Sequence, residues 1–158
     1  MCSRLAMLKG KIELKLADGD LNRLVTATLD EFKGSLRADI ETDLQPMPEA
    51  LIDSEQIHKV LTNLVMNANE AVNGNGVIRV ATTHEANTVG LSVRDNGCGM
   101  SEEFIKNSLF RPFQTTKKKG LGIGLFHSKL IVEAHRGRLE VNSTVGKGTE
   151  FRVVLPIH

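Results

Sequence analysis

A chain of 158 residues that is 41% hydrophobic and 25% charged has the length and composition of a soluble globular domain with one core. Its net charge of +1 creates no overall field that would attract nucleic acid or an anionic membrane, so neither is an expected partner. No apolar run approaches the roughly 20 residues of a membrane span. Two cysteines cannot build a disulfide framework or a metal cluster, so we expect a reducing, cytoplasmic setting.

The first half of the chain is predicted to alternate between strands and helices. Residues 11–16 alternate as a short strand, and a helix begins at the capping residue Asp20 and ends near Gly34. Residues 37–44 alternate again. A Pro-punctuated break then precedes a long helix from about Ser54 to Val72, which the turn NGNG ends.

The second half is predicted to add two hairpins and one helix. Residues 77–85 and 88–95 form the first hairpin, the stretch 96–120 is irregular, and a helix runs from about Leu121 to His135. Residues 137–143 and 149–156 form the last hairpin around the turn TVGKG. The predicted fold class is therefore α/β: a two-layer sandwich in which helices cover an open mixed sheet.

A stripe of polar residues lies on one edge of the long helix. Asn63, Asn67 and Glu70 stand one above another at helical spacing, beside the apolar face. An asparagine oxygen is a hard neutral ligand suited to Mg²⁺ that keeps its waters and binds phosphate oxygens. Taken alone, the stripe is more simply interpreted as the solvated edge of an amphipathic helix.

The motif DNGCGM follows a predicted strand. Asp95 at the strand end can accept a hydrogen bond from an exocyclic amine such as that of adenine. Gly97 and Gly99 permit positive φ and the close approach of a ligand to the backbone. The alternative is an ordinary turn, because Asp-Asn-Gly is a common turn sequence.

A second glycine-rich stretch, TTKKKGLGIGL, leads into the next helix. Gly120, Gly122 and Gly124 would expose successive backbone N–H groups at the positive end of the helix dipole, which forms an anion site. The spacing matches neither a Walker loop nor a dinucleotide fingerprint. A flexible linker is the alternative, but the well-patterned helix that follows at once argues against it.

In combination, the motifs resemble the nucleotide-binding domain of sensor histidine kinases, within the superfamily of gyrase, Hsp90 and MutL. The matching stretches are NLVMNANEA (N box), DNGCGM (G1 box), LFRPFQTTK (F box), GLGIGL (G2 box) and GKGTEFRVVLP (the last glycine box). The resemblance covers about residues 53–156, and the wording PFQTTK is most similar to the nitrogen-regulator-type subgroup. It implies a Bergerat-type ATP-binding fold in residues 12–158, with residues 1–11 as the remnant of an upstream helical dimerisation region.

The resemblance also implies roles for individual residues. Asn67 would hold Mg²⁺, Asn63 and Glu70 would lie by the phosphates or metal waters, and Lys117 would contact the γ-phosphate. Asn63, Asn67 and Lys117 would be the catalytic residues. The implied nucleotide-binding set is Asn63, Asn67, Glu70, Asp95, Gly97, Gly99, Phe110, Phe113, Lys117, Gly120, Leu121, Gly122, Ile123, Gly124, Leu125 and Thr149.

The sequence departs from the ATP-hydrolysing relatives at one position. They carry a water-activating glutamate one turn before the metal-binding asparagine, where this chain has Asn63, which is no general base. The departure favours phosphate transfer over hydrolysis. None of the five histidines has a phosphoacceptor context, so the acceptor is expected upstream.

The implied partners are ATP, an upstream dimerisation and phosphoacceptor domain of the same protein, and a response regulator. The chain itself is expected to be a monomer and its parent a homodimer. Two alternatives stay open: a stand-alone serine kinase of the anti-sigma-factor type, and a nucleotide-binding docking module without catalysis.

Overall fold

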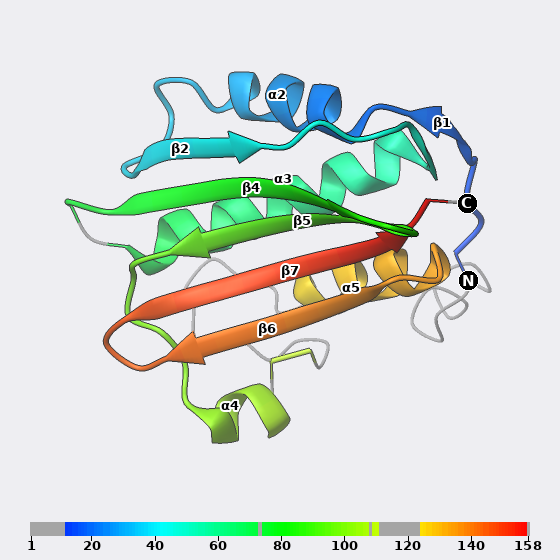
Figure 1. The fold of residues 1–158 in the computed structure, drawn as a ribbon. Helices are drawn as coiled ribbons and strands as arrows, with labels where there is room; N and C mark the ends of the chain where they lie inside the picture. The colour runs from blue at the N-terminus through cyan, green and yellow to red at the C-terminus, as the bar shows by residue number, and fades with distance from the viewer. Residues whose placement is uncertain (1–11, 73, 108, 111–123, 158) are drawn as a thin grey trace, which may run out of the picture.

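The computed structural model describes residues 12–72, 74–107, 109–110 and 124–157. Five strands form one sheet in the order β2-β4-β5-β7-β6 (Figure 1). Their bounds are Asp39–Leu44 (β2), Val77–Glu85 (β4), Thr88–Asp95 (β5), Arg138–Thr144 (β6) and Gly148–Pro156 (β7). β2 is parallel to β4 and the other pairs are antiparallel, so the predicted open mixed sheet is confirmed.

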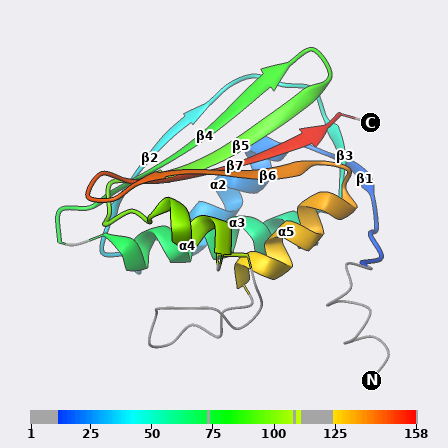
Figure 2. The same ribbon diagram turned by 90° about the horizontal axis from the view of Figure 1, so that it is seen from below.

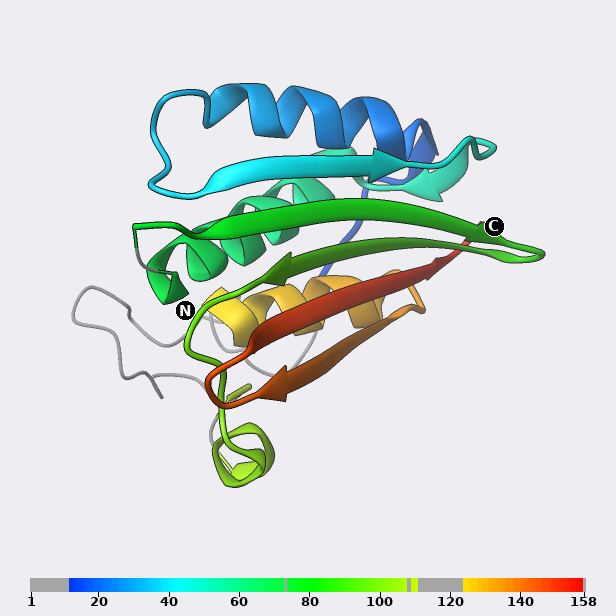
Figure 3. The ribbon, with the colours of Figure 1, turned by 60° about the vertical axis from the view of Figure 1, so that its left-hand side comes forward.

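Helices cover one face of this sheet (Figure 2). They are α2 (Leu21–Glu31), α3 (Ser54–Ala71) and α5 (Gly124–Ala134), and α3 lies beside α5 behind the strands (Figure 3). No helix in the described ranges is long and apolar enough to cross a membrane.

The core lies between α3, α5 and the inner face of the sheet. Alternate strand residues point inward, as a half-buried sheet requires, and meet the apolar arc of α3 predicted from helical spacing. Fully burying one such aliphatic side chain contributes about 1.5–3 kcal/mol. The core includes Ile57, Val60, Leu61, Leu64, Val65, Ile78, Val80, Leu91, Val93, Ile131, Val132, Val153 and Leu155.

The predicted strand at 11–16 is wrong for residues 12–16, to which the structure assigns no strand. The first strand is instead β1 (Ala17–Gly19), which pairs antiparallel with β3 (Ala50–Ile52), a strand that the sequence pattern did not indicate. The backbone N–H of Lys15 donates to Asp53 Oδ2 at 2.9 Å instead of to a neighbouring strand. The side chain of Asp53, distant in sequence, thus accepts the hydrogen bond that a neighbouring strand would accept in the predicted strand.

The interpretation of residues 96–120 as irregular is also wrong in part. Residues Glu102–Asn107 form the short helix α4. Ser101 Oγ accepts the N–H of Phe104 at 3.1 Å, an N-cap, and two glutamates occupy the first turn. These are ordinary start signals, but six residues are too few to show helical periodicity.

Candidate nucleotide site

The polar stripe lies on α3, where its position follows from the helix pattern. Asp53 caps the helix, since Asp53 Oδ1 accepts the N–H of Gln56 at 3.2 Å. Asn63 and Asn67 are half-buried and Glu70 is exposed. The stripe therefore borders the core, as expected, with amide oxygens that are partly shielded from water.

The loop after β5 folds around the Asp95 carboxylate. Asp95 is 7% exposed, and its Oδ1 accepts the N–H of Gly97 at 2.8 Å. The next N–H, that of Cys98, donates to the carbonyl of Ala71 at 3.2 Å. A Cβ on Gly97 would collide with that same carbonyl, so glycine is required where this loop crosses the end of α3.

The turn between β6 and β7 packs against the Asp95 loop. Gly99 has φ +73° and lies so close to the carbonyl of Thr144 that a Cβ would collide with it. Gly148 lies in the same way against the carbonyl of Asp95. Gly97 and Gly99, which were predicted to admit a ligand, here lie against neighbouring backbone.

Thr149, one of the residues of the implied nucleotide-binding set, lies beside Asp95. The two residues are register partners on β5 and β7, and Thr149 is buried. Ser143 Oγ lies 2.7 Å from Thr149 Oγ1 and accepts the N–H of Met100 at 2.8 Å. Sequence reasoning missed Ser143, because a serine on a strand carries no motif and only the β6–β7 pairing places it here.

α3 connects this loop to the start of α5. At its C-terminal end, Ala71 contacts the Asp95 loop through the Cys98 hydrogen bond. Two turns earlier, Asn63 Nδ2 donates to Ser128 Oγ on α5 at 3.1 Å. Asn67 lies on the same edge of α3, one helical turn from Asn63 and one from Ala71. The metal-binding candidate therefore lies between the loop and the N-terminal part of α5.

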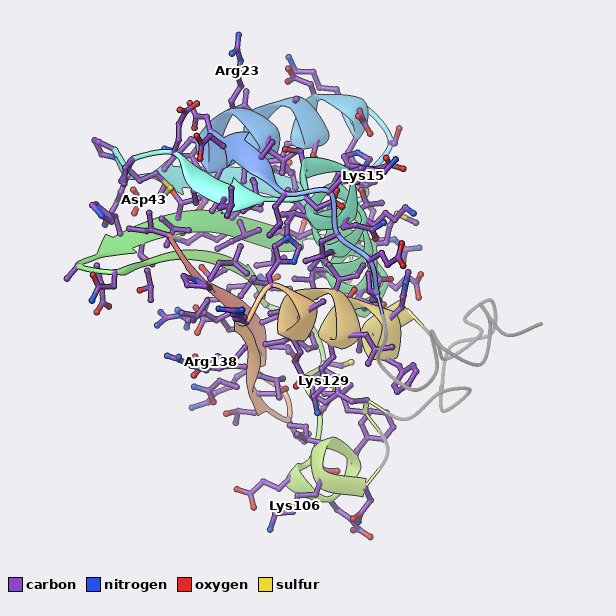
Figure 4. All side chains as sticks on the ribbon, turned by 90° about the vertical axis from the view of Figure 1, so that its right-hand side faces the viewer. Lys15, Arg23, Asp43, Lys106, Lys129 and Arg138 are labelled. Carbon is purple, nitrogen blue, oxygen red and sulfur yellow. The ribbon has the colours of Figure 1, made fainter. Side chains whose placement is uncertain are left out.

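Several predicted residues fall outside the described part of the chain: Phe113, Lys117, Gly120, Leu121, Gly122 and Ile123. Gly124 is the first residue of α5, and Leu125 is half-buried. Phe110 packs partly buried against the core, and Lys129 Nζ lies 5.1 Å from its ring centroid. This cation–π contact connects Phe110 to α5. Figure 4 labels Lys129, which extends from α5.

His127, on the first turns of α5, adds no positive charge here at neutral pH. Burial lowers the pKa of His127 below its ordinary value of 6.5, and the neighbouring Lys59 lowers this pKa further. The ring is therefore mainly neutral at pH 7.

The donor set fits Mg²⁺-ATP. Asn67 and Glu70 offer hard oxygen ligands, and Mg²⁺ that keeps its waters and bridges phosphates needs only one or two ligands from the protein. The buried Asp95 oxygen is an acceptor suited to an amine. Gly97, Gly99 and Gly148 each lie against a neighbouring backbone carbonyl, so none of the three positions has room for a side chain.

Comparison with known proteins agrees with this geometry. The family model described as "Histidine kinase-, DNA gyrase B-, and HSP90-like ATPase" matches residues 52–158. Sensor histidine kinase ZraS of Escherichia coli (strain K12) is 34% identical over 160 aligned residues, covering 99% of this chain and 34% of the relative. Sporulation kinase C of Bacillus subtilis (strain 168) is 39% identical over 105 residues, 66% of this chain and 24% of the relative.

Solved structures show the same fold. The catalytic domain of histidine kinase ThkA superposes with a TM-score of 0.82 at 29% identity, covering 91% of this chain and 97% of the other. Full-length ShkA in complex with AMPPNP has a TM-score of 0.81 at 26% identity, covering 92% of this chain and 32% of the other. The chain spans about a third or less of the length of the curated relatives that it matches.

Proposed function

Because the chain belongs to the histidine kinase-, DNA gyrase B- and HSP90-like ATPase family, whose domain binds ATP, we propose that it is the catalytic part of a two-component sensor histidine kinase. It binds Mg²⁺-ATP and transfers the γ-phosphate to a histidine on a helical hairpin domain of its parent. The observation that carries the proposal is the position of Asn67, one turn from Asn63 at α5 and one turn from Ala71 at the Asp95 loop.

The Asp95 loop and the start of α5 are assigned to different parts of the nucleotide. At one end, the Asp95 carboxylate accepts a hydrogen bond from the adenine amine, with Gly97, Gly99 and Thr149 around it. At the other end, the glycine stretch that leads into α5 binds the phosphates through backbone N–H groups. Asn67 would hold Mg²⁺, which would supply positive charge to neutralise the phosphates. Lys117 contacts that phosphate.

Asn63 supports transfer instead of hydrolysis. An amide cannot take a proton from water, so a water molecule near the γ-phosphate lacks a general base at this position. A histidine side chain is itself a nucleophile and does not need that base.

Phosphate transfer also requires components outside this chain. We propose an upstream dimerisation and phosphoacceptor domain, a response regulator as the next acceptor, and a homodimeric parent. The similar curated proteins are sensor kinases, which does not favour the serine-kinase or docking alternatives.

Phosphotransfer in trans tests this function. The chain is mixed with the helical hairpin domain of its parent and radiolabelled Mg²⁺-ATP, and acid-labile label on the hairpin is measured. The unaltered chain should label the hairpin and not itself. Asn67→Ala should abolish labelling because the metal ligand is lost, whereas nucleotide binding persists in weakened form.

Asn87→Ala is the matched control, since Asn87 is exposed in the turn between β4 and β5, at the opposite end of the strand from Asp95. It should transfer phosphate at the unaltered rate. Full transfer by Asn67→Ala would refute the metal assignment, and acid-labile label on the chain alone would refute the need for an upstream acceptor.

A further inference from the structure

Ser128 is buried at the contact between α3 and α5. It is 2% exposed, and its Oγ accepts a hydrogen bond from Asn63 Nδ2 at 3.1 Å. The two residues are 65 positions apart, so only the packing of the two helices brings them together. A buried serine that accepts this bond constrains an amide that otherwise rotates easily about its last side-chain torsion.

Gly124, one turn before Ser128 on α5, also lies against this amide. A Cβ built on Gly124 would lie 2.5 Å from Asn63 Oδ1 and 2.7 Å from Nδ2, distances that no side chain tolerates. The first residue of α5 is thus a glycine at the point where Asn63 lies against it. Asn63 therefore lies against two residues of α5 that are one turn apart.

The direction of the hydrogen bond decides what Asn63 presents to a ligand. Since Nδ2 donates to Ser128, the oxygen Oδ1 is the end of the amide available as an acceptor. An acceptor repels phosphate oxygens, which are acceptors too. It suits the hydrogen atoms of water bound to Mg²⁺.

We propose that Ser128 is a positioning residue of the nucleotide site: it orients the Asn63 amide so that Oδ1 accepts from metal-bound water. This inference rests on the proposed function, because it takes Asn63 to lie by the metal and phosphates. It predicts that Ser128 acts on the Mg²⁺-dependent part of ATP affinity and leaves metal-free ATP binding unchanged. A purely structural serine would affect both equally.

Calorimetric titration with ATP, in Mg²⁺ and in EDTA, tests the inference. Ser128→Ala should weaken Mg²⁺-ATP binding about 3- to 10-fold, the range for loss of one hydrogen bond, and leave the affinity in EDTA unchanged. Thr28→Val is the matched control, because it also removes a buried hydroxyl, one without a partner in the described part of the structure. It should leave both affinities unchanged.

A double-mutant cycle separates this inference from the proposed function. If Ser128 acts through Asn63, Ser128→Ala causes no further loss when Asn63 is already alanine. Equal Mg²⁺-ATP affinity for Asn63→Ala and the unaltered chain would refute the role proposed for Asn63. A loss in Asn63→Ala without one in Ser128→Ala, or an equal loss in Mg²⁺ and EDTA, would overturn the role of Ser128 alone.

Ser128→Cys keeps the test decisive if the alanine variant does not fold. The thiol occupies nearly the same space but is a weaker acceptor, so the variant should show the alanine phenotype. In addition, the side-chain amide resonances of Asn63 in the nucleotide-free protein should shift in Ser128→Cys. Unchanged resonances would overturn the inference without any reference to ATP.

Discussion

The Asp95 carboxylate organises its own loop, and an isosteric amide cannot reproduce both of its acceptor oxygens. One oxygen accepts the N–H of Gly97 at 2.8 Å, and Asp95 is 7% exposed. An asparagine at this position can still turn its oxygen toward Gly97. Its NH₂ would then occupy the place of the second carboxylate oxygen.

Asp95→Asn should therefore weaken ATP binding while the fold persists. A donor that faces the adenine amine leaves two buried groups unpaired, which costs about 1–3 kcal/mol of binding free energy. Calorimetry measures this directly, with Asp39→Asn, an exposed carboxylate at the start of β2, as the control. Equal ATP affinities for Asp95→Asn and the unaltered chain would remove the adenine assignment.

At the scale of elements, His135 joins the start of α3 to the end of α5. It is 6% exposed, its Nε2 accepts the backbone N–H of Asp53 at 3.0 Å, and its Nδ1 donates to the carbonyl of Ile131 at 2.8 Å. Asp53 in turn caps α3 and accepts the N–H of Lys15. These bonds hold together the two helices that carry the candidate site.

His135→Phe should destabilise the domain by about 1–3 kcal/mol, because a ring of similar size leaves the buried N–H of Asp53 without its acceptor. Urea unfolding of the nucleotide-free chain gives this difference. His84→Phe, at an exposed position of β4, should change the free energy of unfolding by less than about 0.5 kcal/mol. Equal stability of the two variants would show that the histidine contact contributes nothing.

The whole molecule presents a polar outer surface on the strands. Arg79 on β4 pairs with Asp43 on β2 at 3.0 Å, and Arg138 pairs with Glu140 on β6 at 2.8 Å. Such exposed pairs add little stability. Their charged side chains make the outer face of the sheet polar. Four large hydrophobic residues are exposed in the described part of the chain: Leu16, Leu51, Met66 and Val145.

We therefore predict that the chain by itself is a monomer of 17.3 kDa at micromolar concentration. Sedimentation equilibrium measures the mass, and fusion to the helical hairpin of the parent should double the number of chains per particle. A dimer of the isolated chain would contradict the prediction and place an association surface within residues 1–158.

The amino-acid sequence by itself determined the sheet-and-helix layout, the apolar arc of α3 and the motif residues that we propose for the site. Periodicity and capping are local properties, so Asp20, Asp53 and the two hairpins could be recognised from neighbouring residues alone. The order of the N, G1 and G2 boxes likewise needs no coordinates, because it depends on residue identity and spacing.

Only the tertiary structure decided which distant residues share the site. Ser128 and Ser143 have no motif, and Asn63 reaches one of them only because α3 packs against α5. The short elements β3 and α4 were missed because three or six residues carry too little pattern, and the strand that pairs with β3 lies far away in sequence. Packing, which is a long-range property, sets the orientation of each site residue.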